Sequence, residues 1–189
     1  MVGKGEREHW RFSLDDYHRL IEIGVLNEDT PVELIDGELL TMSPINPRHN
    51  SAVMRLTELF VRALGDRAIV SPQCSLTLPP ASEPEPDVAV LRRRDDFYVR
   101  ANPGPADVHF VVEVADSSSR FDRFSKLPLY ARSGISEAWL VDLAHDVVIV
   151  ATEPSATGYA TVVEHRAPAT IAPEAFPDIV VDVASLLRH

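Results

Sequence analysis

Residues 108–142 read VHFVVEVADSSSRFDRFSKLPLYARSGISEAWLVD, and this stretch decides the fold. It begins with an apolar, β-branched run, residues 108–114, that has the length of a buried strand. A second such run covers residues 137–143. Between them lies a helical pattern that ends at Gly134, with apolar positions at Phe124, Leu127, Tyr130 and Ala131. A strand, a helix and a strand of these lengths predict a crossover unit within a sheet.

One carboxylate, Glu113, interrupts the first of these strands. Burying an ionised carboxylate without a partner costs several kcal/mol or more. Glu113 is therefore expected to lie at an exposed strand end, to be neutralised by a neighbour, or to bind a cation.

The rest of the chain supplies further helices and strands around this unit. Ser13 is expected to cap a helix over residues 14–26, and Asp36-Gly37 marks the turn of a hairpin within residues 31–42. A long amphipathic helix is expected over residues 48–64, ending at Gly65. Short strands are expected over residues 68–78 (two pieces broken near Pro72), 87–91, 147–151 and 159–164. This order predicts an α/β (mixed α+β) fold in which helices pack on a mixed sheet.

The composition sets the class of protein. A chain of 189 residues favours one domain, which we place at residues 13–189 after an N-terminal arm at residues 1–12. Its single cysteine excludes an internal disulfide, which fits a cytoplasmic location. No apolar run approaches the ~20 residues of a membrane span. The net charge of −11 argues against indiscriminate binding to nucleic acid, but carboxylates that hold divalent cations add negative charge, so a nuclease remains compatible.

Two acidic residues stand beside apolar strands and are candidates for chemistry. Asp87 opens the short strand at residues 87–91, and Glu113 lies in the strand at residues 108–114. If these strands are neighbours, the two carboxylates converge and form an oxygen-rich site suited to Mg²⁺ or Mn²⁺. Such a metal lowers the pKa of a bound water and neutralises charge on a phosphate. Lys126 is then placed to orient the water or stabilise the transition state, and Glu33 of the hairpin is a candidate third carboxylate.

Simpler interpretations stand beside this one. A carboxylate at a strand end is often solvated or paired with arginine, and a lone helix lysine is usually solvated. We also name His49, Ser117 and Arg120 as candidate substrate contacts, although capping or packing is the more common role for the first two. Arginines at several further positions are candidates for a basic rim that contacts the DNA backbone, namely Arg92, Arg93, Arg94, Arg123 and Arg132.

The segments ELIDGELLTMSP, PRHNSAV, EPDVAVL and VVEVADSSSRFDRFSKLPLYARSGISEAWLVD, in this order, resemble the Uma2 family of restriction-endonuclease-like proteins, formerly a domain of unknown function. The resemblance runs from Val32 to the tail. It implies the fold of the PD-(D/E)xK nuclease superfamily, a central mixed sheet flanked by helices with a divalent metal at the strand ends.

Carried over by position, Asp87 is the acidic residue of the PD element and Glu113 is that of the second element. The superfamily lysine would fall two residues later, where this chain has Ala115. Lys126 matches the lysine of the family instead, Glu33 matches its early acidic residue, and His49 matches a family histidine. The departure at Ala115 leaves catalytic competence open.

These observations leave more than one function in view. The first hypothesis is a Mg²⁺- or Mn²⁺-dependent endonuclease acting on DNA, as a homodimer because cutting two strands with one site per subunit needs two subunits. The alternative is a catalytically inactive nuclease-fold protein that acts as a binding or interaction module. A hydrolase of RNA or another phosphoester is a third, weaker hypothesis.

Overall fold

The computed structural model describes residues 9–27, 29–42, 46–116 and 125–187. The candidate residues Ser117, Arg120 and Arg123, and the apolar position Phe124, lie outside these ranges. In chain order the elements are α1 (Leu14–Glu22), β1 (Val32–Ile35), β2 (Glu38–Thr41), α2 (Pro47–Leu64), η1 (Gly65–Arg67), β3 (Ala68–Pro72), β4 (Val88–Arg92), η2 (Pro105–Asp107), β5 (Val108–Ala115), α4 (Leu127–Arg132), β6 (Glu137–Asp142), β7 (Val147–Ser155), β8 (Gly158–His165), β9 (Thr170–Ile171), β10 (Val181–Asp182) and α5 (Val183–Leu186).

The described part of the chain is organised around a six-stranded sheet of order β3-β4-β5-β6-β7-β8. β5 and β6 pair in parallel, with Glu113 opposite Leu140, and every other neighbouring pair in this sheet is antiparallel. The parallel pair is joined through α4, which confirms the crossover unit expected from the sequence. The sheet is therefore mixed, and the predicted fold class is confirmed.

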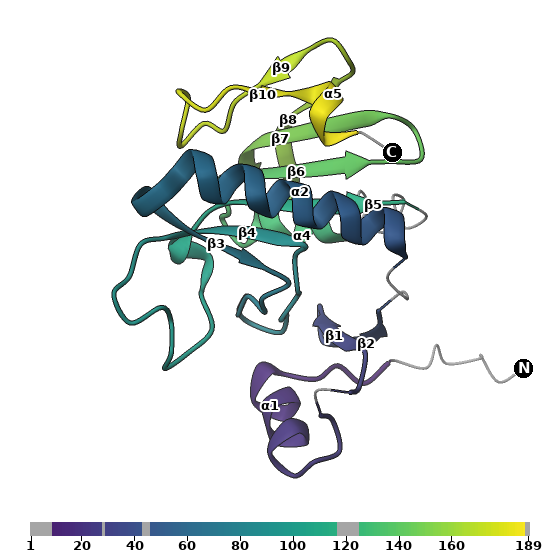
Figure 1. Ribbon diagram of the computed structural model, residues 1–189. Helices are drawn as coiled ribbons and strands as arrows, with labels where there is room; N and C mark the ends of the chain where they lie inside the picture. Colours follow the sequence, from purple (N-terminus) through teal and green to yellow (C-terminus); the bar gives the residue numbers. More distant parts are fainter. Residues whose placement is uncertain (1–8, 28, 43–45, 117–124, 188–189) are drawn as a thin grey trace, which may run out of the picture.

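Alternating side chains of the sheet form two cores, one on each face, and α2 lies across the sheet in Figure 1. Phe110, Val112 and Val114 of β5 face the core under α2 and α5, and Val111 and Ala115 face the core that contains α4. This alternation follows from the two-residue period of a strand. A central strand that is apolar on both faces buries both, so the uninterrupted run of β5 places it in the middle of the molecule.

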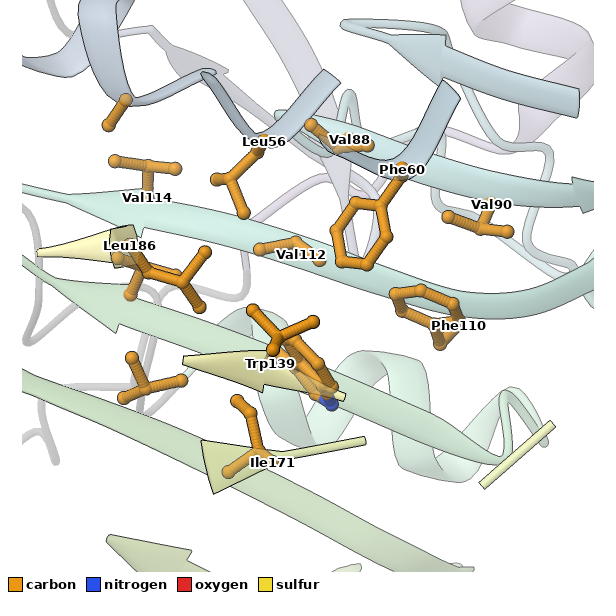
Figure 2. Close-up of a cluster of buried hydrophobic side chains, with 14 of the residues drawn as sticks. Leu56, Phe60, Val88, Val90, Phe110, Val112, Val114, Trp139, Ile171 and Leu186 are labelled. Atoms are coloured by element: carbon orange, nitrogen blue, oxygen red, sulfur yellow. The ribbon is translucent and has the colours of Figure 1, made fainter. Parts of the chain in front are cut away.

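The larger core is centred on three aromatic rings (Figure 2). Phe60 of α2 lies with its ring centroid 5.2 Å from that of Phe110 and 5.9 Å from that of Trp139, both in edge-to-face arrangements. All three side chains are fully buried. These contacts hold α2 across β5 and β6. The first turn of α2 then lies near the end of the sheet where β4 begins.

The helix boundaries follow the sequence signals. The side chain of Asn46 caps α2 by accepting from the backbone N–H of His49, and Gly65 with a φ of 55° ends it. Ser13 and Asp16 form a capping box on α1. α1 ends at Glu22, earlier than the predicted end at residue 26, and Gly24 just beyond it has a φ of 73°. Pro128 stands in the first turn of α4, where proline needs no N–H partner.

The hairpin and the segment after β3 differ in how well the sequence predicts them. β1 and β2 pair around Asp36 and Gly37, which have φ of 51° and 79°, as a two-residue hairpin turn requires. The prediction of two strands over residues 68–78 is wrong: β3 ends at Pro72, and Gln73 with a φ of 50° turns the chain away. Residues 76–78 then bond irregularly, with Leu76 N donating to Pro84 O and Thr77 N to Pro103 O.

The hairpin and the segment that precedes α1 hold together at one end of the molecule, beside α1 (Figure 1). Phe12 N donates to Gly37 O at 2.8 Å, and Arg11 pairs with Glu38 at 3.1 Å. A Cβ at Gly37 would lie 2.8 Å from Arg11 Cβ, so the turn needs glycine for space as well as for φ.

Among the described residues, no helix has both the length and the apolar character of a membrane span.

We predict that Phe60→Ala lowers the free energy of unfolding by about 3–5 kcal/mol, because it removes a ring from a close-packed core. Urea unfolding measures the change. Phe97→Ala is the matched control, since the Phe97 side chain is 59% exposed, and it is expected to change stability by less than about 0.5 kcal/mol. Equal effects of the two substitutions would contradict the packing described here.

Candidate active site

Four candidate residues lie near one another at the end of the sheet where β4 begins and β5 ends. We call Glu33, Asp87, Glu113 and Lys126 the acidic site. β4 and β5 are antiparallel with Val88 opposite Val112, so the start of β4 and the end of β5 lie together. Asp87 directly precedes β4, and Glu113 stands near the end of β5. All four side chains are buried, with residue exposures between 2% and 9%.

Asp87 is held against the end of β5. Its Oδ2 accepts a hydrogen bond from the backbone N–H of Val114 at 2.8 Å, the residue that follows Glu113. The same oxygen lies 3.0 Å from Nε2 of His49, in the first turn of α2. An ionised carboxylate only accepts, so Nε2 carries the proton in this contact. The predicted convergence of the strand bearing Asp87 with the strand bearing Glu113 is therefore present.

Lys126 links the other two carboxylates. Its Nζ lies 3.2 Å from Oε2 of Glu33 and 3.4 Å from Oε1 of Glu113. Of the three possibilities raised by Glu113, burial with neutralisation by a neighbour is the one observed. Lys126 lies in the π-helical turn that leads directly into α4, and it is buried rather than solvated on the helix surface.

Three further contacts position these groups. The hydroxyl of Tyr130 donates to Oε1 of Glu113 at 2.5 Å, and Glu85 N donates to Oε2 of Glu33 at 3.3 Å. Arg132 of α4 pairs with Asp36 in the hairpin turn at 2.5 Å. This last pair fastens the hairpin to α4, and so it holds Glu33 against Lys126. Arg132, which we expected at a basic rim that contacts DNA, instead forms an ion pair between α4 and the hairpin turn.

The electrostatics of the site favour a cation. Three carboxylates and one ammonium give the acidic site a formal charge of −2. Removing such charge from water is costly unless it is compensated. Nearby, burial raises the pKa of the Tyr17 hydroxyl, with the charges of Glu83, Glu85 and Glu33 adding to the effect. The acidic residues of this edge thus act on α1 as well.

The donor set fits a hard divalent cation bound largely through water. Within the described ranges, no group of three or more His, Cys, Asp or Glu side chains is arranged to hold a metal ion. Mg²⁺, however, is commonly bound through only one or two carboxylates while it keeps several waters. Asp87 and Glu113 on adjacent strands supply that number, and both are oxygen ligands. The metal itself stays a prediction.

Two candidate residues have positions that the sequence did not indicate. His49, expected to contact substrate, lies against Asp87, which gives it the position of a group that orients a carboxylate. Tyr130 was assigned to the core by its apolar pattern, and its ring is indeed buried, yet its hydroxyl reaches Glu113. The signal for Tyr130 was available: a buried tyrosine hydroxyl needs a polar partner, and Glu113 is the acidic residue of the preceding strand.

The neighbouring polar residues extend the site along the start of α2. Arg48 donates from NH1 to Oδ1 of Asp116 at 2.8 Å and from NH2 to the carbonyl of Leu143 at 2.5 Å. Asn46 donates to Oδ2 of Asp116 at 2.9 Å. These bonds tie the beginning of α2 to the end of β5, on the same edge as Asp87.

The mixed sheet between helices, with acidic side chains where β4 begins and β5 ends, has a counterpart among solved structures. A solved structure from Anabaena variabilis, described as "a putative nuclease belonging to DUF820", matches it with a TM-score of 0.74 over 93% of this chain and 97% of that one, at 15% sequence identity.

The family is shown by sequence. The chain belongs to the Uma2 family, whose model is described as "Putative restriction endonuclease" and matches residues 14–184. This confirms the resemblance found in the sequence. No curated protein matches the chain.

We predict that Lys126→Met lowers the free energy of unfolding by about 3–5 kcal/mol in metal-free buffer, because it leaves Glu33 and Glu113 buried without their shared ammonium. Chemical unfolding in the presence of EDTA measures the loss. Arg62→Met serves as the control, since it removes a cation whose side chain is 79% exposed and is expected to cost less than about 1 kcal/mol. A loss no larger than that of the control would mean that the ammonium is not the partner of these carboxylates.

Proposed function

We propose that this protein is a metal-dependent endonuclease that hydrolyses DNA phosphodiester bonds at the acidic site. The single observation that carries the proposal is the buried contact of Lys126 with Glu33 and Glu113, beside which Asp87 accepts from the backbone N–H of Val114, the residue after Glu113. Membership in the Uma2 family, whose model is described as "Putative restriction endonuclease", supports the same interpretation. The acidic site keeps excess negative charge after the Lys126 ammonium is counted, and buried charge without compensation is costly, which supports a cation bound there.

In this proposal Asp87 and Glu113 are the metal ligands, and Glu33 is the third acidic residue of the site. When bound, Mg²⁺ or Mn²⁺ supplies a water of lowered pKa and offsets the charge of the phosphate. His49 holds Asp87 through Oδ2, which leaves Oδ1 of Asp87 to face the ligand. Tyr130 holds Glu113 through Oε1. Both carboxylates are therefore oriented by protein groups before any ligand arrives.

Lys126 takes the role of the superfamily lysine from a different place in the backbone. The position two residues after Glu113 is Ala115, which is buried in the core. The ammonium of Lys126 nevertheless lies 3.4 Å from Glu113. From there it stabilises negative charge that develops on the phosphate or orients the attacking water. An amine at this point supports catalysis despite the departure from the usual motif.

The remaining parts of the proposal concern the assembly and its setting. We propose a homodimer, because one acidic site per chain cuts one strand and two strands require two sites. DNA as the substrate and a cytoplasmic location accompany this proposal, and the family supports the first of them.

We predict that the purified protein nicks supercoiled plasmid in Mg²⁺ or Mn²⁺ and that EDTA abolishes the activity. Asp87→Ala and Glu113→Ala should each lower the rate by about 100-fold or more, because each removes a proposed metal ligand. Agarose electrophoresis of the nicked form gives the rates. Glu58→Ala, which removes a 60% exposed carboxylate from the surface of α2, should cut at the rate of the unmodified protein. Equal rates for all four proteins would remove the assignment.

A nuclease-fold binding module is the second candidate, and Ala115 is the observation that favours it. Titration calorimetry with Mn²⁺ separates the two. We predict binding at millimolar metal or below in the unmodified protein and its loss in Asp87→Ala, because the site carries excess negative charge. No heat of binding at millimolar Mn²⁺ in either protein would favour the module.

A further inference from the structure

A second concave region lies outside the acidic site. A hollow of about 740 Å³ opens between α1, the segment around Thr77 and the loop that joins β4 to β5. This volume is in the range of small-molecule and cofactor sites. Its wall includes His18, Thr77, Tyr98, Arg100 and Asn102.

The polar side of the hollow is fixed by one buried carboxylate. Glu83 is 5% exposed and accepts from Thr77 Oγ1 at 3.1 Å and from Asn102 Nδ2 at 3.3 Å. Nε2 of His18 lies 2.8 Å from the same carboxylate. Three hydrogen-bonding side chains from three segments are thereby held in place. A hydroxyl that donates once can still accept, so Thr77 can accept a hydrogen bond from a ligand. The amide of Asn102 has a second N–H and an oxygen, so it can both donate and accept.

The rim of the hollow is basic and aromatic. Residues 92–100 read RRRDDFYVR, which is four arginines against two aspartates, a local charge of +2 in a chain of −11. The guanidinium of Arg93 lies 4.9 Å from the ring centroid of Phe97, and that of Arg94 lies 4.5 Å from the ring centroid of Tyr98. Phe97 is 59% exposed and Val99 is 79% exposed. Apolar side chains at such exposure, among arginines, form a surface for flat, negatively charged ligands.

The backbone takes an unusual conformation at Phe97 and Tyr98, of which Phe97 is exposed and Tyr98 packs partly buried against the core that contains α4. Phe97 and Tyr98 have φ of 47° and 60°, in the left-handed region that bulky residues rarely occupy. The hydroxyl of Tyr98 donates to the carbonyl of Arg92 at 2.8 Å, and the Arg94 guanidinium is bonded twice to Asp96. Strained residues of this kind gather at ligand sites, and the bonds here hold the loop in that conformation.

We propose that the hollow and its rim bind an unpaired nucleotide of a DNA strand. The base stacks on the exposed ring of Phe97, its edge faces Thr77 and Asn102, and the flanking phosphates face Arg93 and Arg100. Stacking requires a base with a free face, which duplex DNA does not offer. The inference rests on the proposed function in taking DNA as the substrate, and it adds that the substrate contains a single-stranded segment.

The hollow and the acidic site are joined by a short structured segment. Glu83 N donates to Leu34 O at 2.7 Å, which is next to Glu33, and Glu83 precedes Asp87 by four residues. A strand held in the hollow is therefore held at a fixed offset from the carboxylates. The proposed nuclease would then act beside an unpaired stretch of its substrate.

Fluorescence anisotropy in EDTA tests the binding without catalysis. The probes are a labelled single-stranded DNA oligonucleotide and the duplex of the same sequence. We expect tighter binding of the single strand, and a loss of affinity of about 5- to 100-fold in both Phe97→Ala and Arg100→Ala. Ala101→Trp, which places a large side chain at the wall of the hollow, should lose affinity as well. Arg166→Ala is the charge-matched control: Arg166 is exposed and follows β8, at the opposite edge of the sheet from β3 and β4.

Tighter binding of the duplex, or affinities of the three loop variants equal to that of Arg166→Ala, would overturn the inference. Glu58→Ala, which removes a 60% exposed carboxylate from α2, is expected to bind the single strand like the unmodified protein, because that carboxylate belongs to neither the hollow nor the acidic site. The two proposals thus fail separately. Plasmid that stays intact with metal refutes the nuclease, whereas unchanged single-strand binding in Phe97→Ala and Arg100→Ala refutes only the nucleotide site.

Discussion

The contact of one ammonium with two buried carboxylates is the constraint on which the site depends. Lys126 reaches Glu33 and Glu113 at 3.2 and 3.4 Å, and each of the three is almost excluded from solvent. A buried pair of this kind contributes little net stability compared with apolar packing, but it is costly to break. The main effect of the contact is therefore to fix the relative positions of the three segments that carry these residues. The hairpin, the central strand and the start of α4 can each vary only in ways that keep this contact.

The sheet provides the frame that makes the contact possible. Because β4 and β5 run antiparallel, a residue before one strand meets a residue near the end of the other. Because β5 and β6 run in parallel, the chain must cross over the sheet between them, and that crossover brings Lys126 and Tyr130 back over Glu113. The aromatic core under α2 holds the opposite face, so that His49 at the start of α2 reaches Asp87. The site is a product of topology more than of any local motif.

Much of this was readable from the sequence because local signals were strong. The hydrophobic run with one glutamate gave β5, Asp36-Gly37 gave the hairpin, and the proline and glycine positions bounded the helices. The wrong prediction, a second strand after Pro72, came from an apolar pattern that long-range bonds to residues 84 and 103 override. The role of His49 beside Asp87, and of Tyr130 beside Glu113, depended on tertiary contacts that no periodicity reports. The sequence likewise cannot distinguish an arginine that contacts DNA from one that forms an internal ion pair, and the role of Arg132 follows from its contact with Asp36.

The span between Glu33 and Lys126 along the chain has a consequence for how the protein comes into being. The contact joins residues far apart in the chain, and it can form only when the crossover that carries Lys126 packs on the sheet. A nascent chain that stops before α4 carries the early acidic residues but lacks the amine that joins them. Completion of the crossover is thus the step at which the charged groups of this edge acquire their mutual arrangement, so that assembly of the chemistry and completion of the fold are one event.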